Sequence, residues 1–166
     1  MKPIAIVYTS NTGHTMRYAK LLGAKTDLPT YTLERACSVL EKGDPVIYMG
    51  WLFANSIKGY GKAAKRFDVR ATVGVGLSPN GALEAEARQA NKIAETAVLF
   101  TVQGGMDYEA LKGVNKFAIA MLTRSLLKKA DRTPADDAQL KLLQEGGDFV
   151  CDENLASVLA WWEKLD

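Results

Sequence analysis

Short apolar runs that alternate with glycine-bearing loops and helical segments constrain the fold of this chain more than any other feature. Four clear runs cover residues 4–8, 46–50, 71–77 and 97–102, and a weaker one covers residues 30–33. Continuous apolar runs of this length are typical of strands buried on both faces of a parallel sheet. They predict an α/β fold.

Helical patterns fill the intervals between these runs. Strands that alternate with helices favour a doubly wound parallel sheet. We expect five strands in the order 2-1-3-4-5, helices on both faces, extra helices after strand five, and one domain over residues 1–166. Gly23 is expected to end the first helix, and Ser78-Pro79 to open a later one. The expected helices cover residues 12–23, 35–41, 62–67, 79–94, 108–129, 133–146 and 153–165.

The composition is that of an ordinary globular protein. Of the 166 residues, 48% are apolar and 24% are charged. No apolar run reaches 18 residues, and the first run is too short for the core of a signal peptide. We therefore expect a cytoplasmic protein without a membrane-spanning helix. The formal net charge of +2 is too small to predict nucleic-acid binding.

Cysteine and histidine are scarce. The two cysteines, Cys37 and Cys151, have no CxxC spacing, and His14 is the single histidine. These numbers predict neither a disulfide framework nor a metal site. No catalytic residue is identified, and any catalytic dyad that uses histidine must use His14.

The loop after the first strand carries the strongest ligand signal. In a doubly wound sheet, ligands bind outside the carboxyl ends of the strands, near the switch between strands one and three. Ser10, Thr12 and Thr15 supply hydroxyl groups there, and Gly13 allows close backbone approach. The helix N-terminus that follows attracts a phosphate dianion. The loop therefore predicts a phosphate site; the alternative is that Ser10 or Thr12 only caps the helix.

Other phosphate motifs are missing from the sequence. There is no GxxxxGK[ST] segment, and no GxGxxG segment follows the first strand. Gly74-Val75-Gly76 lies inside the fourth expected strand. We interpret this glycine pair as a sign of close packing rather than of nucleotide binding.

Residues 8–15, Tyr-Thr-Ser-Asn-Thr-Gly-His-Thr, resemble the flavodoxin phosphate signature, in which Ser/Thr-x-Thr-Gly-x-Thr opens the first helix. The order of strands and helices supports this resemblance over residues 1–103 and again at the last helix. The resemblance implies a flavodoxin-like fold that binds flavin mononucleotide (FMN). The contacts it implies at this loop are those of Thr9, Ser10, Asn11, Thr12, Gly13, His14 and Thr15.

Two further loops at the same edge of the expected sheet are candidates for contact with the flavin ring. After the third strand, an aromatic side chain can stack on the ring, or the same aromatics can belong to the core. After the fifth strand, adjacent glycines permit close approach to a flat ligand, and the alternative is a flexible entry into the next helix. The candidates are Gly50, Trp51, Leu52, Phe53, Ala54 and Asn55 in the first loop, and Gln103, Gly104, Gly105 and Tyr108 in the second.

The segment after strand five contains residues that a minimal five-stranded fold does not need. Residues 108–129 are predicted to form a basic amphipathic helix. A peripheral membrane contact or an acidic redox partner is one interpretation. We favour the other, a helix packed on the domain with its charges in solvent.

The sequence as a whole predicts an FMN-binding, flavodoxin-like electron-transfer protein with a redox partner protein. Two alternatives stay open. The spacing from Gly50 to Gly59 and the long segment after strand five resemble flavodoxin-like protoporphyrinogen oxidases, which implies an FMN-dependent oxidoreductase. The unusual loop after Gly50 also allows a flavin-free interaction module. Because the chain is slightly basic, we expect a less negative second reduction step of the flavin than in acidic flavodoxins.

Overall fold

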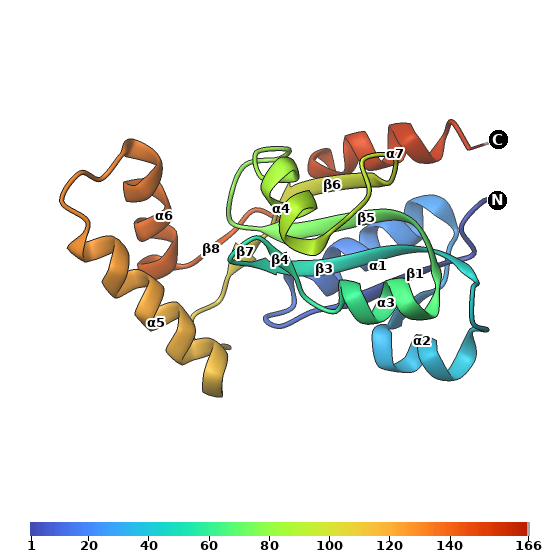
Figure 1. The fold of residues 1–166 in the computed structure, drawn as a ribbon, viewed down its shortest axis with the longest axis horizontal. Helices are drawn as coiled ribbons and strands as arrows, with labels where there is room; N and C mark the ends of the chain where they lie inside the picture. Colours follow the sequence, from blue (N-terminus) through green and yellow to red (C-terminus); the bar gives the residue numbers. More distant parts are fainter. Residues whose placement is uncertain (166) are drawn as a thin grey trace.

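A mainly parallel sheet forms the centre of the molecule. The computed structural model describes residues 1–165. The central strands follow the path β2-β1-β3-β5-β6, and all neighbours along it are parallel (Figure 1). A further short strand, β4, pairs antiparallel with the end of β3. The strands are β1 Ala5–Thr9, β2 Thr30–Thr32, β3 Pro45–Phe53, β4 Ser56–Ile57, β5 Asp68–Gly76 and β6 Val98–Gln103.

The prediction of an α/β fold with a parallel sheet is confirmed, but the sheet is not purely parallel. The expected order 2-1-3-4-5 did not include β4. The observed order of all strands in the sheet therefore differs from the expected order. The five parallel strands alone lie second, first, third, fourth and fifth along the sheet. The sequence pattern did not predict β4, because residues 51–61 form a short, irregular apolar segment that does not indicate a hairpin.

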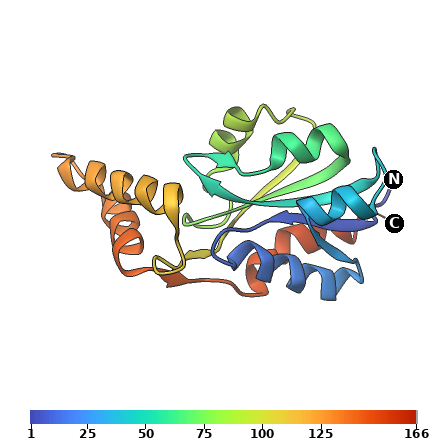
Figure 2. The same ribbon diagram turned by 90° about the horizontal axis from the view of Figure 1, so that it is seen from below.

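Helices cover both faces of the sheet, as predicted. Successive side chains of β1 point to opposite faces. Ile6 packs with Tyr18 of α1, whereas Val7 belongs to the cluster that includes Ala36 of α2. Figure 2 shows α1 and α7 below the sheet, with α3 and α4 above it. The helices are α1 His14–Thr26, α2 Leu33–Val39, α3 Tyr60–Arg66, α4 Glu84–Asn91 and α7 Ala156–Trp162, the last preceded by a short 3-10 turn, Glu153–Leu155.

Two predicted helix boundaries are wrong. Helix α1 continues through Gly23 to Thr26. A Cβ at Gly23 would lie 2.7 Å from the Thr30 methyl group, so this glycine allows strand β2 to approach the helix and does not end it. Ser78-Pro79 does not open a helix either, because α4 begins at Glu84 after the turn that Pro79 enters.

A helical arm, residues 105–148, projects beyond the end of the sheet (Figure 1). Its two helices pack on each other, and two short antiparallel strands, β7 and β8, close its base. The prediction of one helix from residue 108 is wrong at its start, since that helix begins at Gly113. Thr133 and Asp136 form a capping box, as the predicted start of the next helix requires. The elements are β7 Gly105–Met106, α5 Gly113–Lys128, α6 Pro134–Glu145 and β8 Gly147–Asp148.

The arm has a small core of its own, which joins it to the sheet. Leu111, Ile119 and Leu143 are its buried residues. Phe53 from the end of β3 and Leu77 after β5 pack against them. Among residues 1–165, no helix is long and apolar enough to cross a membrane.

Candidate functional site

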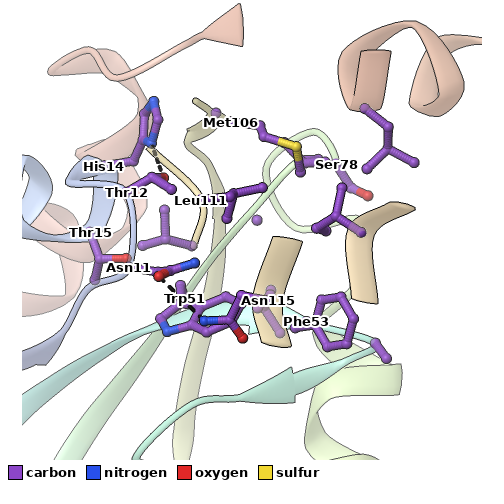
Figure 3. A pocket seen from close by; sticks show the side chains of 18 of the residues that line it. Asn11, Thr12, His14, Thr15, Trp51, Phe53, Ser78, Met106, Leu111 and Asn115 are labelled. Atoms are coloured by element: carbon purple, nitrogen blue, oxygen red, sulfur yellow. Dashed lines mark hydrogen bonds between the residues drawn. The ribbon is translucent and has the colours of Figure 1, made fainter. Parts of the chain in front are cut away.

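A cavity of about 230 Å³ lies where the arm meets the carboxyl ends of the central strands (Figure 3). One part of its wall is the loop after β1, a second is the β3–β4 hairpin with the end of β5, and the third is the arm. From the first part come Ser10, Asn11, Thr12, His14 and Thr15; from the second Trp51, Leu52, Phe53, Ala54, Asn55, Val75, Gly76, Leu77, Ser78 and Leu83; from the arm Gly105, Met106, Leu111, Asn115, Ile119, Leu122, Gln139 and Leu143.

Helix α1 begins at the cavity without a side-chain cap. Its N-cap is Gly13, with a φ of 97° that only glycine adopts at little cost. The hydroxyl of Ser10 accepts a hydrogen bond from the Gly13 N–H at 3.2 Å, which leaves the first helical turn uncapped. Thr12 Oγ1 lies 3.0 Å from His14 Nδ1. The alternative that Ser10 or Thr12 caps α1 is therefore wrong, and the N–H groups of this turn are available to another acceptor.

Thr15 supplies a hydroxyl to the same place. The residue is 2% exposed, lies in the first turn of α1 and lines the cavity (Figure 3). No described residue forms a hydrogen bond with its hydroxyl. Its oxygen is not completely buried and opens on the space of the cavity. A ligand with an acceptor oxygen at this point would supply the missing partner.

The aromatic segment after Gly50 is a strand and a tight turn rather than a loop. Strand β3 runs on to Phe53, and Leu52 and Phe53 pair with Ile57 and Ser56 of β4. The Trp51 and Phe53 rings, two residues apart on one face, have centroids 6.1 Å apart. The hairpin thus presents a fixed aromatic wall to the cavity.

Asn91 of α4 holds this hairpin in place. Its Oδ1 accepts a hydrogen bond from the Ile57 N–H at 2.8 Å, and its Nδ2 donates to the Asn55 carbonyl at 2.9 Å. The turn itself consists of Ala54 and Asn55, which have positive φ values of 46° and 63°. Positive φ at both central residues is the feature of a type I′ hairpin turn.

The glycines near this wall allow neighbouring backbone and side-chain atoms to pack closely. A Cβ at Gly50 would lie 2.6 Å from the Lys58 carbonyl oxygen, and Gly50 does not line the cavity. Cβ atoms at Gly74 and Gly76 would lie 3.0 and 3.2 Å from Leu52 Cδ1. This close approach confirms the interpretation of the glycine pair as a packing feature.

Of the predicted residues after β6, only Gly105 lines the cavity. The carbonyl of Gln103 accepts hydrogen bonds from the Tyr18 hydroxyl and, at 3.1 Å, from Asn154 Nδ2. The N–H of Gly104 donates to the Gly76 carbonyl at 2.8 Å. Both residues therefore fix the base of the arm. Tyr108 lies outside the cavity, with the Lys116 ammonium 5.1 Å from the centre of its ring.

Thr9 and Gly13 border a different hollow. The Thr9 hydroxyl accepts a hydrogen bond from the Tyr48 hydroxyl at 2.8 Å. The hollow has a volume of about 580 Å³ and lies on the other side of the same loop, with Ser10 and Asn11 shared between the two spaces. The loop after β1 therefore faces two spaces at once.

His14 links the loop to the base of the arm. Its Nε2 lies 4.0 Å from Asp148 Oδ1, and Arg17 Nη1 donates to Asp148 Oδ2 at 2.5 Å. Burial lowers the pKa of His14, the charge of Arg17 lowers it further, and the charge of Asp148 opposes both. The hydrogen bond from Arg17 lowers the pKa of Asp148. His14 is therefore a neutral imidazole at pH 7.

Sequence reasoning missed the wall that the arm contributes. The helix expected over residues 108–129 was predicted to pack on the domain, but no cavity was predicted beside it; Leu111, Ile119 and Leu122 divide their contacts between the core of the arm and the cavity. Asn115 Nδ2 lies 3.4 Å from Asn11 Oδ1, which brings the arm to the loop after β1 (Figure 3). The amphipathic pattern was a visible signal, but it does not say which element a helix faces.

The chemistry of the cavity is apolar with neutral polar groups at one end. Among the described residues that line it, none is Asp, Glu, Lys or Arg. The cavity is therefore suited to a flat apolar group that carries an oxygen-rich, acceptor-bearing end. Comparison of the chain with protein-family models, curated proteins and solved structures gave no match.

Proposed function

We propose that this protein is a flavodoxin-like electron carrier that binds FMN at the cavity between the arm and the sheet. The observation that carries the proposal is the meeting of three features at one place: the hydroxyl loop, the aromatic hairpin and the apolar side of the arm. The order of the parallel strands and the flavodoxin-like signature at residues 8–15 support it.

The residues present fit the two ends of FMN. The unpaired Thr15 hydroxyl and the uncapped first turn of α1 suit the phosphate. Trp51 and Phe53 on one side and the apolar side chains of the arm on the other suit a flat tricyclic ring. When bound, FMN supplies one- and two-electron redox chemistry, while the protein orients it and excludes water.

The size of the cavity limits which part of the cofactor it holds. Small-molecule pockets usually measure roughly 300–1,000 Å³, so a cavity of about 230 Å³ is small for the whole of FMN. We place the ring inside it and the phosphate at the loop after β1. The aromatic and apolar side chains that line the cavity hold the ring, and the Thr15 hydroxyl and the backbone N–H groups of residues 14 and 15 bind the phosphate.

A visible absorption spectrum of the purified protein, before and after addition of FMN, tests the proposal. Binding predicts shifted flavin bands and quenched flavin fluorescence, with one FMN per chain. A colourless protein that leaves added FMN unchanged would contradict it and favour the flavin-free interaction module. The electron donor and acceptor in this proposal are redox partner proteins.

A second candidate is an FMN-dependent oxidoreductase of the protoporphyrinogen oxidase type. The specific observation in its favour is that Leu111, Ile119, Leu122 and Leu143 of the arm form one wall of the cavity. A carrier needs an accessible flavin edge, whereas an enzyme needs an enclosed apolar space next to it. Turnover of protoporphyrinogen by the FMN-loaded protein, without a second protein, separates the two candidates.

A further inference from the structure

The arm exposes an apolar surface that its own packing does not use. Val114, Phe117 and Met121 of α5 are 82%, 69% and 52% exposed. At about 100° per residue they fall within a narrow stripe on one side of the helix. Ile119 and Leu122, on another side, pack in the core of the arm. The expectation that the apolar positions of this helix pack on the domain is wrong for these three exposed residues.

This helix is basic, and Arg124 and Lys128 lie on the side of the stripe. Residues 110–130 contain no Asp or Glu. Lys112, Lys116, Arg124 and Lys128 are exposed, and within residues 1–165 none of them forms an ion pair. Lys129 differs, because its Nζ contacts Asp136 Oδ2 at 2.6 Å. The exposed side of α5 therefore combines large apolar side chains with uncompensated positive charge.

The position of α5 leaves this side open to a broad surface. The arm, which includes α5, forms one end of the molecule (Figures 1 and 2). The stripe is convex and belongs to a single helix, so a rigid protein partner would need a matching groove. The interface of a lipid bilayer adapts to a convex helix, and its anionic headgroups complement the cations.

We propose that α5 docks this protein on the surface of an anionic lipid bilayer. Phe117 and Met121 enter the boundary between headgroups and acyl chains, and Arg124 and Lys128 contact the headgroups. The docking is peripheral and reversible. It does not depend on bound flavin, because the stripe lies on the outside of the arm and the cavity on its inside.

Co-sedimentation of the full chain with vesicles tests this proposal. Vesicles of phosphatidylcholine alone are compared with vesicles that contain a quarter phosphatidylglycerol, at low salt and in 0.5 M NaCl. We expect binding to the anionic vesicles only, and its loss at high salt because salt screens the cations. The charge variant Arg124→Gln/Lys128→Gln should bind about 25-fold more weakly, which is about fivefold for each cation removed.

An apolar variant and a matched control complete the experiment. Phe117→Ser/Met121→Ser should weaken binding by about tenfold or more, because both side chains lose burial in the interface. The control Lys20→Gln/Lys65→Gln removes two exposed lysines of α1 and α3, remote from the arm, and should bind like the unchanged protein. Absence of binding to anionic vesicles, or equal losses in the control and in the arm variants, would overturn the proposal.

A spectroscopic measurement covers the case in which an arm variant unfolds. Phe117→Trp keeps an apolar aromatic side chain in the stripe. Lipids with brominated acyl chains should quench the tryptophan fluorescence of this variant more than that of the unchanged protein. Equal quenching in the two proteins would overturn the proposal. Light scattering tests the competing occupant, a second copy of the chain. A dimer that becomes a monomer in Phe117→Ser/Met121→Ser would show that a second copy, and not lipid, covers the stripe.

Discussion

At the scale of single residues, Thr15 links the structure to a ligand most directly. Its hydroxyl has no partner among the described residues, opens on the cavity and lies in the first turn of α1. Thr101 offers a comparison, because its hydroxyl is fully buried and unpaired but lies outside the cavity lining. Of the two, only the Thr15 hydroxyl is in a position to bind a ligand in the cavity.

We predict that Thr15→Val weakens FMN binding by about tenfold or more, because a hydrogen bond to a charged group contributes about 1.5–3 kcal/mol. Thr101→Val should leave the affinity unchanged. Fluorescence titration of FMN with each protein measures this difference. Equal affinities for all three proteins would show that the phosphate does not reach Thr15.

Ala54 is the second residue whose conformation has a measurable consequence. It has a φ of 46°, a region in which a Cβ costs roughly 1–2 kcal/mol. We predict that Ala54→Gly raises the free energy of unfolding by about 1 kcal/mol in urea denaturation. Ala24→Gly, at an exposed helical position of α1, should instead lower it by about 0.5–1 kcal/mol. A loss of stability in Ala54→Gly would contradict the assignment of strain to this turn.

At the scale of elements, the contact between α1 and β8 joins the loop after β1 to the arm. His14 opens α1, Asp148 ends β8, and Arg17 pairs with Asp148. The arm is thereby fixed at its base by charged groups as well as by the pairing of β7 with β8. This arrangement makes the stability of the protein sensitive to the protonation of His14.

We predict that stability falls when the pH is lowered from 7.5 to 5.5. Burial lowers the folded-state pKa of His14 below 6.5, so the unfolded chain binds the proton more readily in this range. The stability from neutral His14 is complete above the unfolded pKa and is lost as the pH falls through the folded pKa. Urea denaturation of the flavin-free protein at several pH values measures this dependence.

His14→Gln is the control for this prediction. His14 is the only histidine of the chain, so the variant should remove most of the pH dependence between 7.5 and 5.5. A variant that keeps the full pH dependence would contradict the assignment of this dependence to His14.

At the scale of the whole molecule, charge is kept away from the cavity. The chain has a net charge of +2, and among the described residues the cavity lining contains no acidic side chain. Acidic surroundings disfavour addition of negative charge to a bound flavin. We therefore expect a second reduction step less negative than that of strongly acidic flavodoxins, measured by spectroelectrochemical titration.

Two variants of α6 test this electrostatic argument. Gln139→Glu places a carboxylate at the cavity lining, whereas Gln144→Glu places the same charge on the same helix outside it. We predict that Gln139→Glu makes the second reduction step more negative by tens of millivolts, the effect of an interaction of about 1 kcal/mol. Gln144→Glu should change it less. The same shift in both variants would contradict a ring position inside the cavity.

Local sequence patterns predict the five parallel strands and the loop after β1. Buried parallel strands need continuous apolar runs, and a tight turn from a strand into a helix favours glycine and small polar residues, so both leave local patterns. No local pattern predicts that residues 51–57 form a hairpin or that the arm closes the cavity. Asn11 and Asn115 meet although 104 positions separate them. Such contacts depend on how distant segments pack, and an amphipathic helix carries the same pattern whichever surface it covers.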